Sequence, residues 1–124
     1  MGYYMDLMDY SIKIEAASFA PALEAVKKAF PKYEELQTIT DFPDAMSEFY
    51  YDPEFDEDGN ICGFVFDGEK LRDDNEFWCA VAPFVEEGSY IEMMGEDYEH
   101  WRWIFKNGQC YAISPTIIWE DETT

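Results

Sequence analysis

Clustered carboxylates are the side chains of this chain whose spacing could do chemistry. Glu54, Asp56 and Asp58 stand at the first, third and fifth positions of a calcium-loop pattern, with Gly59 at the sixth. A complete loop needs a bidentate glutamate at the twelfth position, where this chain has Val65, and it needs flanking helices where we expect strands. We therefore interpret the segment as an acidic hairpin turn and expect no metal or other cofactor.

The sequence contains few residues suited to catalysis. His100 is the single histidine and stands between Glu99 and Trp101, and a histidine in that setting is usually structural. The sequence has no Cys-x-x-Cys pair, glycine-rich phosphate loop or nucleophile elbow. A carboxylate pair such as Glu92 and Glu96 could do acid–base work, but among 28 acids such pairs arise by chance. We expect a protein that is not an enzyme.

The distribution of charge is the most informative pattern. From Tyr33 to Glu69 there are 12 carboxylates, and from Asp73 to Trp101 nine more, with no Lys or Arg in either run. They supply most of the net charge of −20, which destabilises a compact fold through self-repulsion. A basic surface that could receive them usually exists to hold nucleic acid. The pattern favours docking onto such a protein, and it disfavours direct binding to nucleic acid or to an anionic membrane.

Two periodicities predict which acids form the contact surface. Asp41, Asp44 and Glu48, followed by Asp52, recur every three or four residues and would share one face of a helix. Acids two residues apart from Glu54 onward would share one face of a strand and turn. Aromatic residues in the same stretch would serve as interface anchors. The predicted partner-binding set is Asp41, Asp44, Glu48, Asp52, Glu54, Asp56, Glu57, Asp58, Tyr50, Tyr51 and Phe55, with a secondary acidic surface at Glu92, Glu96, Asp97 and Glu99.

Composition predicts one folded domain. Hydrophobic residues make up 48% of the 124 residues and aromatic residues 19%, which is ample for a core despite the charge. No apolar stretch could span a bilayer, and the N-terminus lacks the pattern of a signal peptide. Three widely spaced cysteines argue against a disulfide framework, so a cytoplasmic protein is expected, with Cys79 as a small core residue.

The elements that must position these residues follow from hydrophobic periodicity and turn residues. A helix begins after Ser18 and stops at Pro31, and Pro83 should kink or end a later one. We predict a strand over 5–16, helices over 19–30, 41–50 and 75–85, a hairpin over 50–66, and strands over 89–94, 98–106 and 109–119.

The order β-α-α-β-β-α-β-β-β predicts an α+β domain over residues 1–119, followed by a frayed acidic tail at 120–124. Its antiparallel sheet would carry about three helices, packed mainly on one face. Trp101, Trp103 and Phe105 should share the buried face of a strand, while Arg102 and Lys106 on the other face should pair with carboxylates.

The C-terminal pattern Gly88-Ser89-Tyr90-Ile91-Glu92, Gly95-Glu96-Asp97, Trp101-Arg102-Trp103 and Phe105-Lys106-Asn107-Gly108 resembles small acidic proteins of bacteria, phages and mobile elements. That resemblance implies a context and no activity. By composition the chain is also similar to anti-restriction and anti-CRISPR proteins that mimic DNA, and to immunity proteins that cap basic nucleases.

The expectation is therefore an acidic protein that occludes a basic nuclease or DNA-binding protein by charge mimicry. Two alternatives remain open at this stage. One is a structural, self-associating domain whose acids serve only solubility. The other is a small hydrolase that uses clustered carboxylates and a metal.

Overall fold

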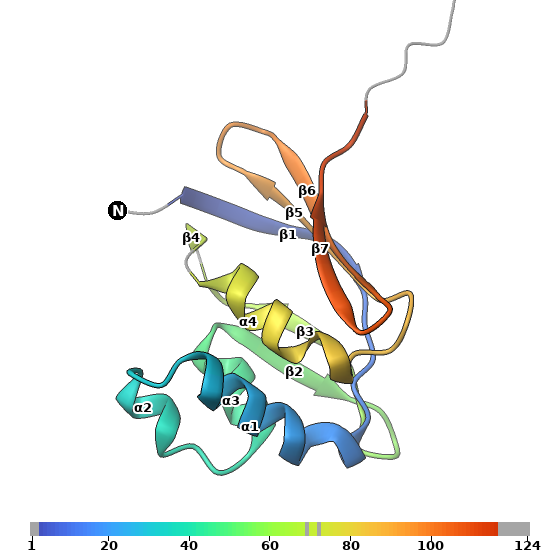
Figure 1. Ribbon diagram of the computed structural model, residues 1–124. Helices are drawn as coiled ribbons and strands as arrows, with labels where there is room; N and C mark the ends of the chain where they lie inside the picture. The colour runs from blue at the N-terminus through green and yellow to red at the C-terminus, as the bar shows by residue number, and fades with distance from the viewer. Residues whose placement is uncertain (1–2, 69, 72, 117–124) are drawn as a thin grey trace, which may run out of the picture.

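The strand β1 (Tyr3–Ser11) lies near the middle of this computed structural model, which describes residues 3–68, 70–71 and 73–116 (Figure 1). It belongs to an antiparallel sheet with the strand order β4-β1-β5-β6-β7. The other strands of that sheet are β4 (Lys70–Leu71), β5 (Tyr90–Gly95), β6 (His100–Lys106) and β7 (Gln109–Ile113). A second antiparallel sheet is the hairpin of β2 (Tyr51–Phe55) and β3 (Ile61–Phe66). The α+β class predicted from the sequence is confirmed.

The division into two sheets differs from the single sheet that we expected. The chain leaves β1 after Ser11, earlier than predicted, and Ile14 then bridges both Ile61 of the hairpin and Val85. Ile14 and Ile61 exchange two backbone hydrogen bonds of 2.9 Å each. A β-bulge between Leu7 and Asp9 already strengthens the twist of β1. The hairpin therefore joins the larger sheet through one bridge instead of a full ladder.

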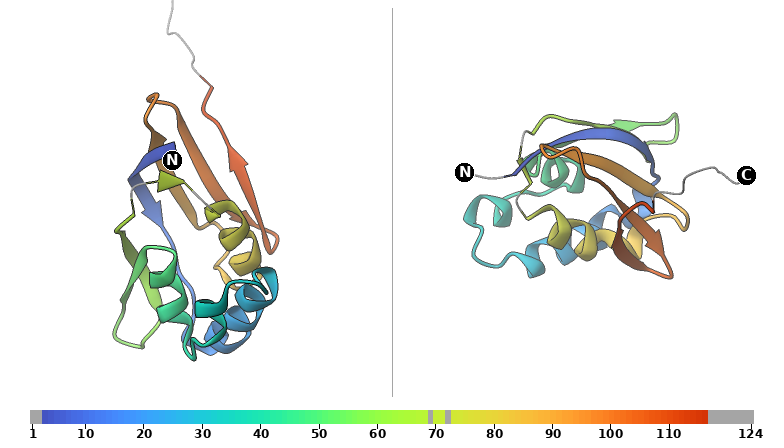
Figure 2. Two further views of the ribbon diagram at one scale, coloured as in Figure 1. Left: turned by 90° about the vertical axis from the view of Figure 1, so that its left-hand side faces the viewer. Right: turned by 90° about the horizontal axis from the view of Figure 1, so that it is seen from above.

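Helices gather on one side of the strands, as the amphipathic patterns predict (Figure 2). They are α1 (Phe19–Ala29), α2 (Glu34–Gln37), α3 (Phe42–Glu48) and α4 (Asp74–Val81), with short 3₁₀ turns η1 (Ala16–Ser18) and η2 (Ala82–Phe84). Pro83 ends α4 at Val81 because its ring cannot continue the helical hydrogen bonding. None of the helices in the described ranges has the length and apolarity to cross a membrane.

Several predicted helices and strands were longer than the observed ones. The helix α3 ends at Glu48, because Tyr50 takes a positive φ of 71° that stops the helix before β2 begins. The last strand ends at Ile113, and the proposed tail at 120–124 lies outside the described residues. Neither α2 nor the two-residue β4 was predicted, since each spans only about one period of its hydrophobic pattern, too little for the pattern to repeat.

An aromatic cluster fills the space between the hairpin and α4. Tyr51 and Trp78 are both fully buried, with ring centroids 5.0 Å apart and edge to face. Phe64 packs against Tyr51 at 5.1 Å, and Phe77 packs against Trp78 at 4.9 Å. Such ring pairs contribute stability beyond the burial of area alone, by about 0.5–1.5 kcal/mol each. The cluster fixes the hairpin against the helices.

One polar contact is buried inside this cluster. The Tyr51 hydroxyl donates a hydrogen bond of 2.6 Å to Oδ2 of Asp74, which is only 4% exposed. Asp74 lies in the first turn of α4, where the positive end of the helix dipole favours a carboxylate. Burial, and then the charge of Asp74, raises the pKa of Tyr51 well above its ordinary value. The pair satisfies two polar groups that would be costly to bury alone.

Tyr51→Phe is expected to lower the free energy of unfolding by about 1–3 kcal/mol, because the buried Asp74 carboxylate loses a donor without gaining water. Urea unfolding followed by circular dichroism measures this. Tyr111→Phe is the matched control, because the Tyr111 hydroxyl is exposed and bonds only to Gln109 among the described residues. An equal, small loss in both variants would show that the buried bond contributes nothing special.

The raised pKa of Tyr51 also predicts an alkaline instability. Unfolded tyrosine ionises near about pH 10, whereas folded Tyr51 stays protonated, so the unfolded state binds fewer protons and stability falls as the pH rises. Between about pH 9.5 and 11 the urea midpoint of Tyr51→Phe should decline less steeply than that of the natural protein. Tyr33, whose pKa is also raised, is present in both proteins and cancels in the comparison. Parallel declines would contradict the assignment.

Candidate acidic docking surface and the polar network of the sheet

The outer face of the hairpin carries the clearest of the predicted acids. Tyr51 and Pro53 pair with Phe66 and Phe64, on the face that packs on the core. Asp52, opposite Val65, and Glu54 therefore point to the other face. Glu54 is exposed, and its Oε1 accepts a long hydrogen bond of 3.4 Å from the Tyr10 hydroxyl.

The tip of the hairpin uses one predicted contact residue for its own folding. Oδ1 of Asp56 accepts hydrogen bonds from the backbone N–H of Asp58 at 2.9 Å and of Asn60 at 3.0 Å. These donors, that of Asn60 above all, lower the pKa of Asp56 below its ordinary value. Gly59 takes a positive φ of 81°, as the Asp-Gly signal predicts. The expected row of acids two residues apart is wrong at Asp56, whose carboxylate turns into the loop.

The acids of α3 are divided in the same way. Asp41 and Asp44 are exposed, whereas Glu48 is half-buried and its Oε2 accepts a 2.7 Å hydrogen bond from the Tyr33 hydroxyl. Burial, followed by this bond, raises the pKa of Tyr33. The predicted helical stack does not include Asp52, because α3 ends at Glu48 and Asp52 lies on β2. Tertiary packing thus leaves Asp41 and Asp44 as the free acids of this segment.

The three aromatic residues predicted as interface anchors differ in their exposure to solvent. Tyr50 and Phe55 are 47% and 50% exposed, as an interface anchor requires. Tyr51 is fully buried in the core and cannot anchor a partner, so its assignment was wrong. Val65, 54% exposed beside Asp52, is an apolar surface residue that sequence reasoning missed. Strand alternation from the buried Phe64 could have indicated it.

The two acidic groups lie at opposite ends of the molecule. Glu96, in the turn after β5, hydrogen-bonds to the backbone N–H of Tyr4 at one end of β1. Asn60, at the hairpin tip, accepts a bond from the N–H of Ala16 beyond the other end. The strand β1 has 9 residues and rises about 3.3 Å per residue, so its two ends lie roughly 30 Å apart. Figure 1 shows the β5–β6 turn and the hairpin tip well separated. No single surface contains both acidic groups.

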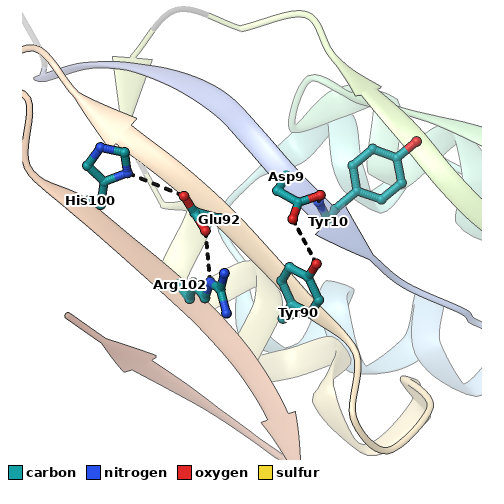
Figure 3. A network of polar contacts seen from close by, with 6 residues as sticks. All are labelled: Asp9, Tyr10, Tyr90, Glu92, His100 and Arg102. Atoms are coloured by element: carbon teal, nitrogen blue, oxygen red, sulfur yellow. Dashed lines mark hydrogen bonds and ion pairs between the residues drawn. The ribbon is translucent and has the colours of Figure 1, made fainter. Parts of the chain in front are cut away.

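Glu92 does not act as a free acid. Its Oε1 accepts a 2.8 Å hydrogen bond from Nε of Arg102, and its Oε2 lies 3.3 Å from Nδ1 of His100 (Figure 3). The Arg102 guanidinium also lies over the Tyr90 ring, 4.8 Å from its centroid, and the Tyr90 hydroxyl donates to Asp9 at 2.8 Å. Pairing with Glu92 raises the pKa of Arg102. The expectation that Arg102 pairs with a carboxylate is confirmed, and the placement of Glu92 on a free acidic surface is wrong.

The remaining secondary acids are Glu96, Asp97 and Glu99. All three are exposed at the β5–β6 turn, next to Tyr98, which is 79% exposed and has a φ of 64°. The turn is thus a small acidic surface with one aromatic residue. Glu96 accepts its backbone hydrogen bond at 2.8 Å, which helps to hold the turn against β1.

The hairpin acids differ from Glu92 in whether a cationic side chain pairs with them. Within the described ranges the Glu92 carboxylate forms an ion pair with the Arg102 guanidinium and also contacts the His100 ring. The acids of the hairpin and of α3 that make neither an ion pair nor a side-chain hydrogen bond in those ranges are Asp41, Asp44, Asp52, Glu57 and Asp58. We call these acids, together with Glu54 and the exposed Tyr50, Phe55 and Val65, the hairpin acidic surface; within this set Asp52, Glu54 and Val65 share the outer face of the hairpin.

Comparison with protein-family models, curated proteins and solved structures finds no match. The chemistry of the site therefore has to be argued from its own side chains. Over the described residues, no three or more His, Cys, Asp or Glu side chains come together in a way that could hold a metal ion. At the hairpin tip, the carboxylate of Asp56 is engaged by the backbone of the turn.

The cysteines also differ from expectation. Cys79 was predicted in the core but is exposed on α4, and its Sγ lies 4.0 Å from the carbonyl oxygen of Cys110 on β7. Burial, with a smaller effect of Cys79, raises the pKa of Cys110 to about 12. A thiol with so high a pKa is a poor nucleophile near neutral pH.

Asp56→Ala is expected to lower the melting temperature, because two backbone N–H groups of the turn lose their acceptor, whereas Asp56→Asn keeps an oxygen and should lose less. The lowered pKa means that this stabilisation is present above about pH 4 and is lost as the pH falls. Thermal unfolding at pH 7 and near about pH 3 should therefore show the difference between Asp56→Ala and the natural protein shrinking. The matched control is Glu57→Ala; an equal loss there would refute a specific turn role.

Proposed function

We propose that this chain is a non-catalytic acidic binding protein that occludes a basic, nucleic-acid-handling protein by charge mimicry. Inhibitors of this kind include anti-restriction, anti-CRISPR and nuclease-immunity proteins. The observation that carries the proposal is the hairpin acidic surface, whose acids form no ion pair within the described residues. Acids placed together without local compensation destabilise the fold, which a binding role would offset.

The spacing of these acids supports mimicry of a single strand more than of a whole duplex. Asp52, Glu54, Glu57 and Asp58 are distributed over the length of β2 and its turn, which is roughly 15 Å, or about 5 Å between neighbouring charges. One strand of DNA has a charge about every 3.4 Å, and the duplex twice as many. A basic groove that follows one phosphate backbone is therefore the kind of partner site that this surface fits.

The exposed apolar residues give the same surface a means of specificity. Phe55 at the end of β2 and Val65 beside Asp52 present about half of their area to solvent, at 50% and 54%. Charge steers the encounter and sets the association rate, whereas buried apolar anchors supply much of the affinity. The proposal places the protein in the cytoplasm, where its three free cysteines would stay reduced.

One observation favours self-association as the second candidate. The strand β7 is an edge of the larger sheet and exposes Tyr111 and Ile113, at 42% and 43%. Such an edge can pair with another chain. Two copies that each carry a charge of −20 repel one another, however, so this association should strengthen as salt screens the charge.

The test of the docking proposal is a quadruple charge reversal, Asp52→Lys, Glu54→Lys, Glu57→Lys and Asp58→Lys. The tagged natural protein captures partners from bacterial lysate at low salt, and each captured basic protein is then assayed for competition with DNA. The reversal should abolish binding and inhibition, and binding by the natural protein should weaken steeply between 50 and about 200 mM salt.

The matched control reverses four exposed acids elsewhere, Asp6, Glu24, Glu76 and Glu86, which changes the net charge by the same amount. This control variant should keep most of the binding and inhibition shown by the natural protein. Equal losses in both variants would mean that only net charge matters. Full inhibition by the hairpin variant would refute the proposal, and salt-strengthened dimers without any captured competitor of DNA would favour self-association.

A further inference from the structure

A pocket lies on the larger sheet where β6 and β7 meet the chain beyond Ile113. Its volume is about 350 Å³, which is in the range of sites for small ligands. The polar end is formed by Glu92, His100 and Arg102, the side chains of the network in Figure 3. Ile113 and Pro115 supply apolar walls, and Ser114 adds a hydroxyl, while the Trp101 ring packs against Trp103 on the other face of β6. Convergent polar groups on an apolar cavity are the usual composition of a binding site.

The network holds the Arg102 guanidinium in one orientation. Nε donates to Glu92 at 2.8 Å, and the plane of the group lies over the Tyr90 ring. The N–H groups on its two Nη atoms donate to no residue in the described part of the chain. A guanidinium presents its donors as a planar fork that matches two oxygens of one anion. Arg102 is therefore fixed on one edge and unused on the other.

The hydrogen-bond inventory of the pocket decides the sign of the ligand. Oε1 of Glu92 accepts from Nε of Arg102, and Oε2 lies 3.3 Å from Nδ1 of His100, which donates when the ring carries its proton there. What remains for a ligand is mostly donors, namely the Nη groups of Arg102 and the Ser114 hydroxyl. A cationic ligand would bring more donors and would meet the guanidinium at close range. An anionic group fits the vacant hydrogen-bonding positions.

The charges of Arg102 and Glu92 favour a ligand with a single negative charge over one with two. Arg102 carries one positive charge and Glu92 one negative charge, so the pocket has no excess of cations for a doubly charged phosphate. The net charge of −20 opposes any anion at long range, but at physiological salt charges beyond about 8 Å are largely screened. We propose that this pocket binds a small organic carboxylate whose apolar body packs against Ile113 and Pro115.

This site is independent of the hairpin acidic surface, because none of its lining residues belongs to that surface. The probe is phenylacetate, titrated into the full-length, ¹⁵N-labelled protein and followed by NMR. Saturable shifts are expected at the backbone amides of residues 100–102 and 113–114. Phenylacetamide, the neutral isostere, should bind at least about tenfold more weakly, because it cannot form a charge-assisted pair with Arg102.

Two pairs of variants make the test specific. Ile113→Glu places a carboxylate at the pocket on an exposed edge-strand position and should weaken phenylacetate binding by about tenfold, whereas Ile113→Gln should not. Arg102→Gln should weaken binding by about tenfold or more. Lys106→Gln removes the same charge from the same face of β6, outside the pocket, and should leave binding nearly unchanged.

Three results would overturn the proposal. The first is the absence of saturable shifts in the natural protein. The second is preferential binding of benzylamine, which would mean that Glu92 selects a cation. The third is equal weakening by Ile113→Glu and Ile113→Gln, or by Arg102→Gln and Lys106→Gln. The Ile113 pair keeps the test decisive if Arg102→Gln disturbs the fold.

Discussion

The buried contact between the hairpin and α4 is the constraint on which the rest of the structure depends. Within the described residues, one backbone bridge, between Ile14 just beyond β1 and Ile61, ties the hairpin to the larger sheet. Its position is therefore set by the face that carries Tyr51, through the aromatic cluster and the hydrogen bond to Asp74. Because that face is turned inward, Asp52 and Glu54 must face solvent. The exposure of these acids therefore follows from the packing of the opposite face in the core.

Magnitudes show why so acidic a chain can fold at all. Burying one large apolar side chain stabilises a fold by about 1.5–3 kcal/mol, and the fully buried set includes Trp78, Trp103 and Phe64. A like-charge pair at helical spacing costs about 0.2–0.5 kcal/mol. Exposed acids such as Asp41 and Asp44 therefore repel one another without approaching the stabilisation from the core. The acid that is buried, Asp74, sits where a helix N-terminus and a phenol hydroxyl stabilise it.

Sequence patterns predicted the local features because their causes are local. The Asp-Gly turn, the end of α4 before Pro83, and the burial of Trp103 and Phe105 follow from backbone preference and strand alternation. The adjacent Tyr50 and Tyr51 could not be told apart in the same way. Which of the two is buried depends on the packing partner of β2, and that partner, α4, lies more than twenty residues further along the chain. The turn role of Asp56 was hidden because free and hydrogen-bonded carboxylates look identical in sequence.

The pairing of distant strands could not be predicted from the sequence either, and this pairing determines how far apart the two acidic groups lie. A sequence shows two acidic runs but not that β1 separates them by roughly 30 Å. At physiological salt that separation exceeds the screening length of about 8 Å several-fold, so the two ends act as independent charges. A partner that recognises acids by charge would have to bind one end or be long enough to span both. The hairpin end has the larger set of uncompensated acids together with exposed apolar residues. At the other end the acids surround a turn, and the nearby Glu92 is neutralised by Arg102, which leaves that end better suited to a small ligand than to a basic protein.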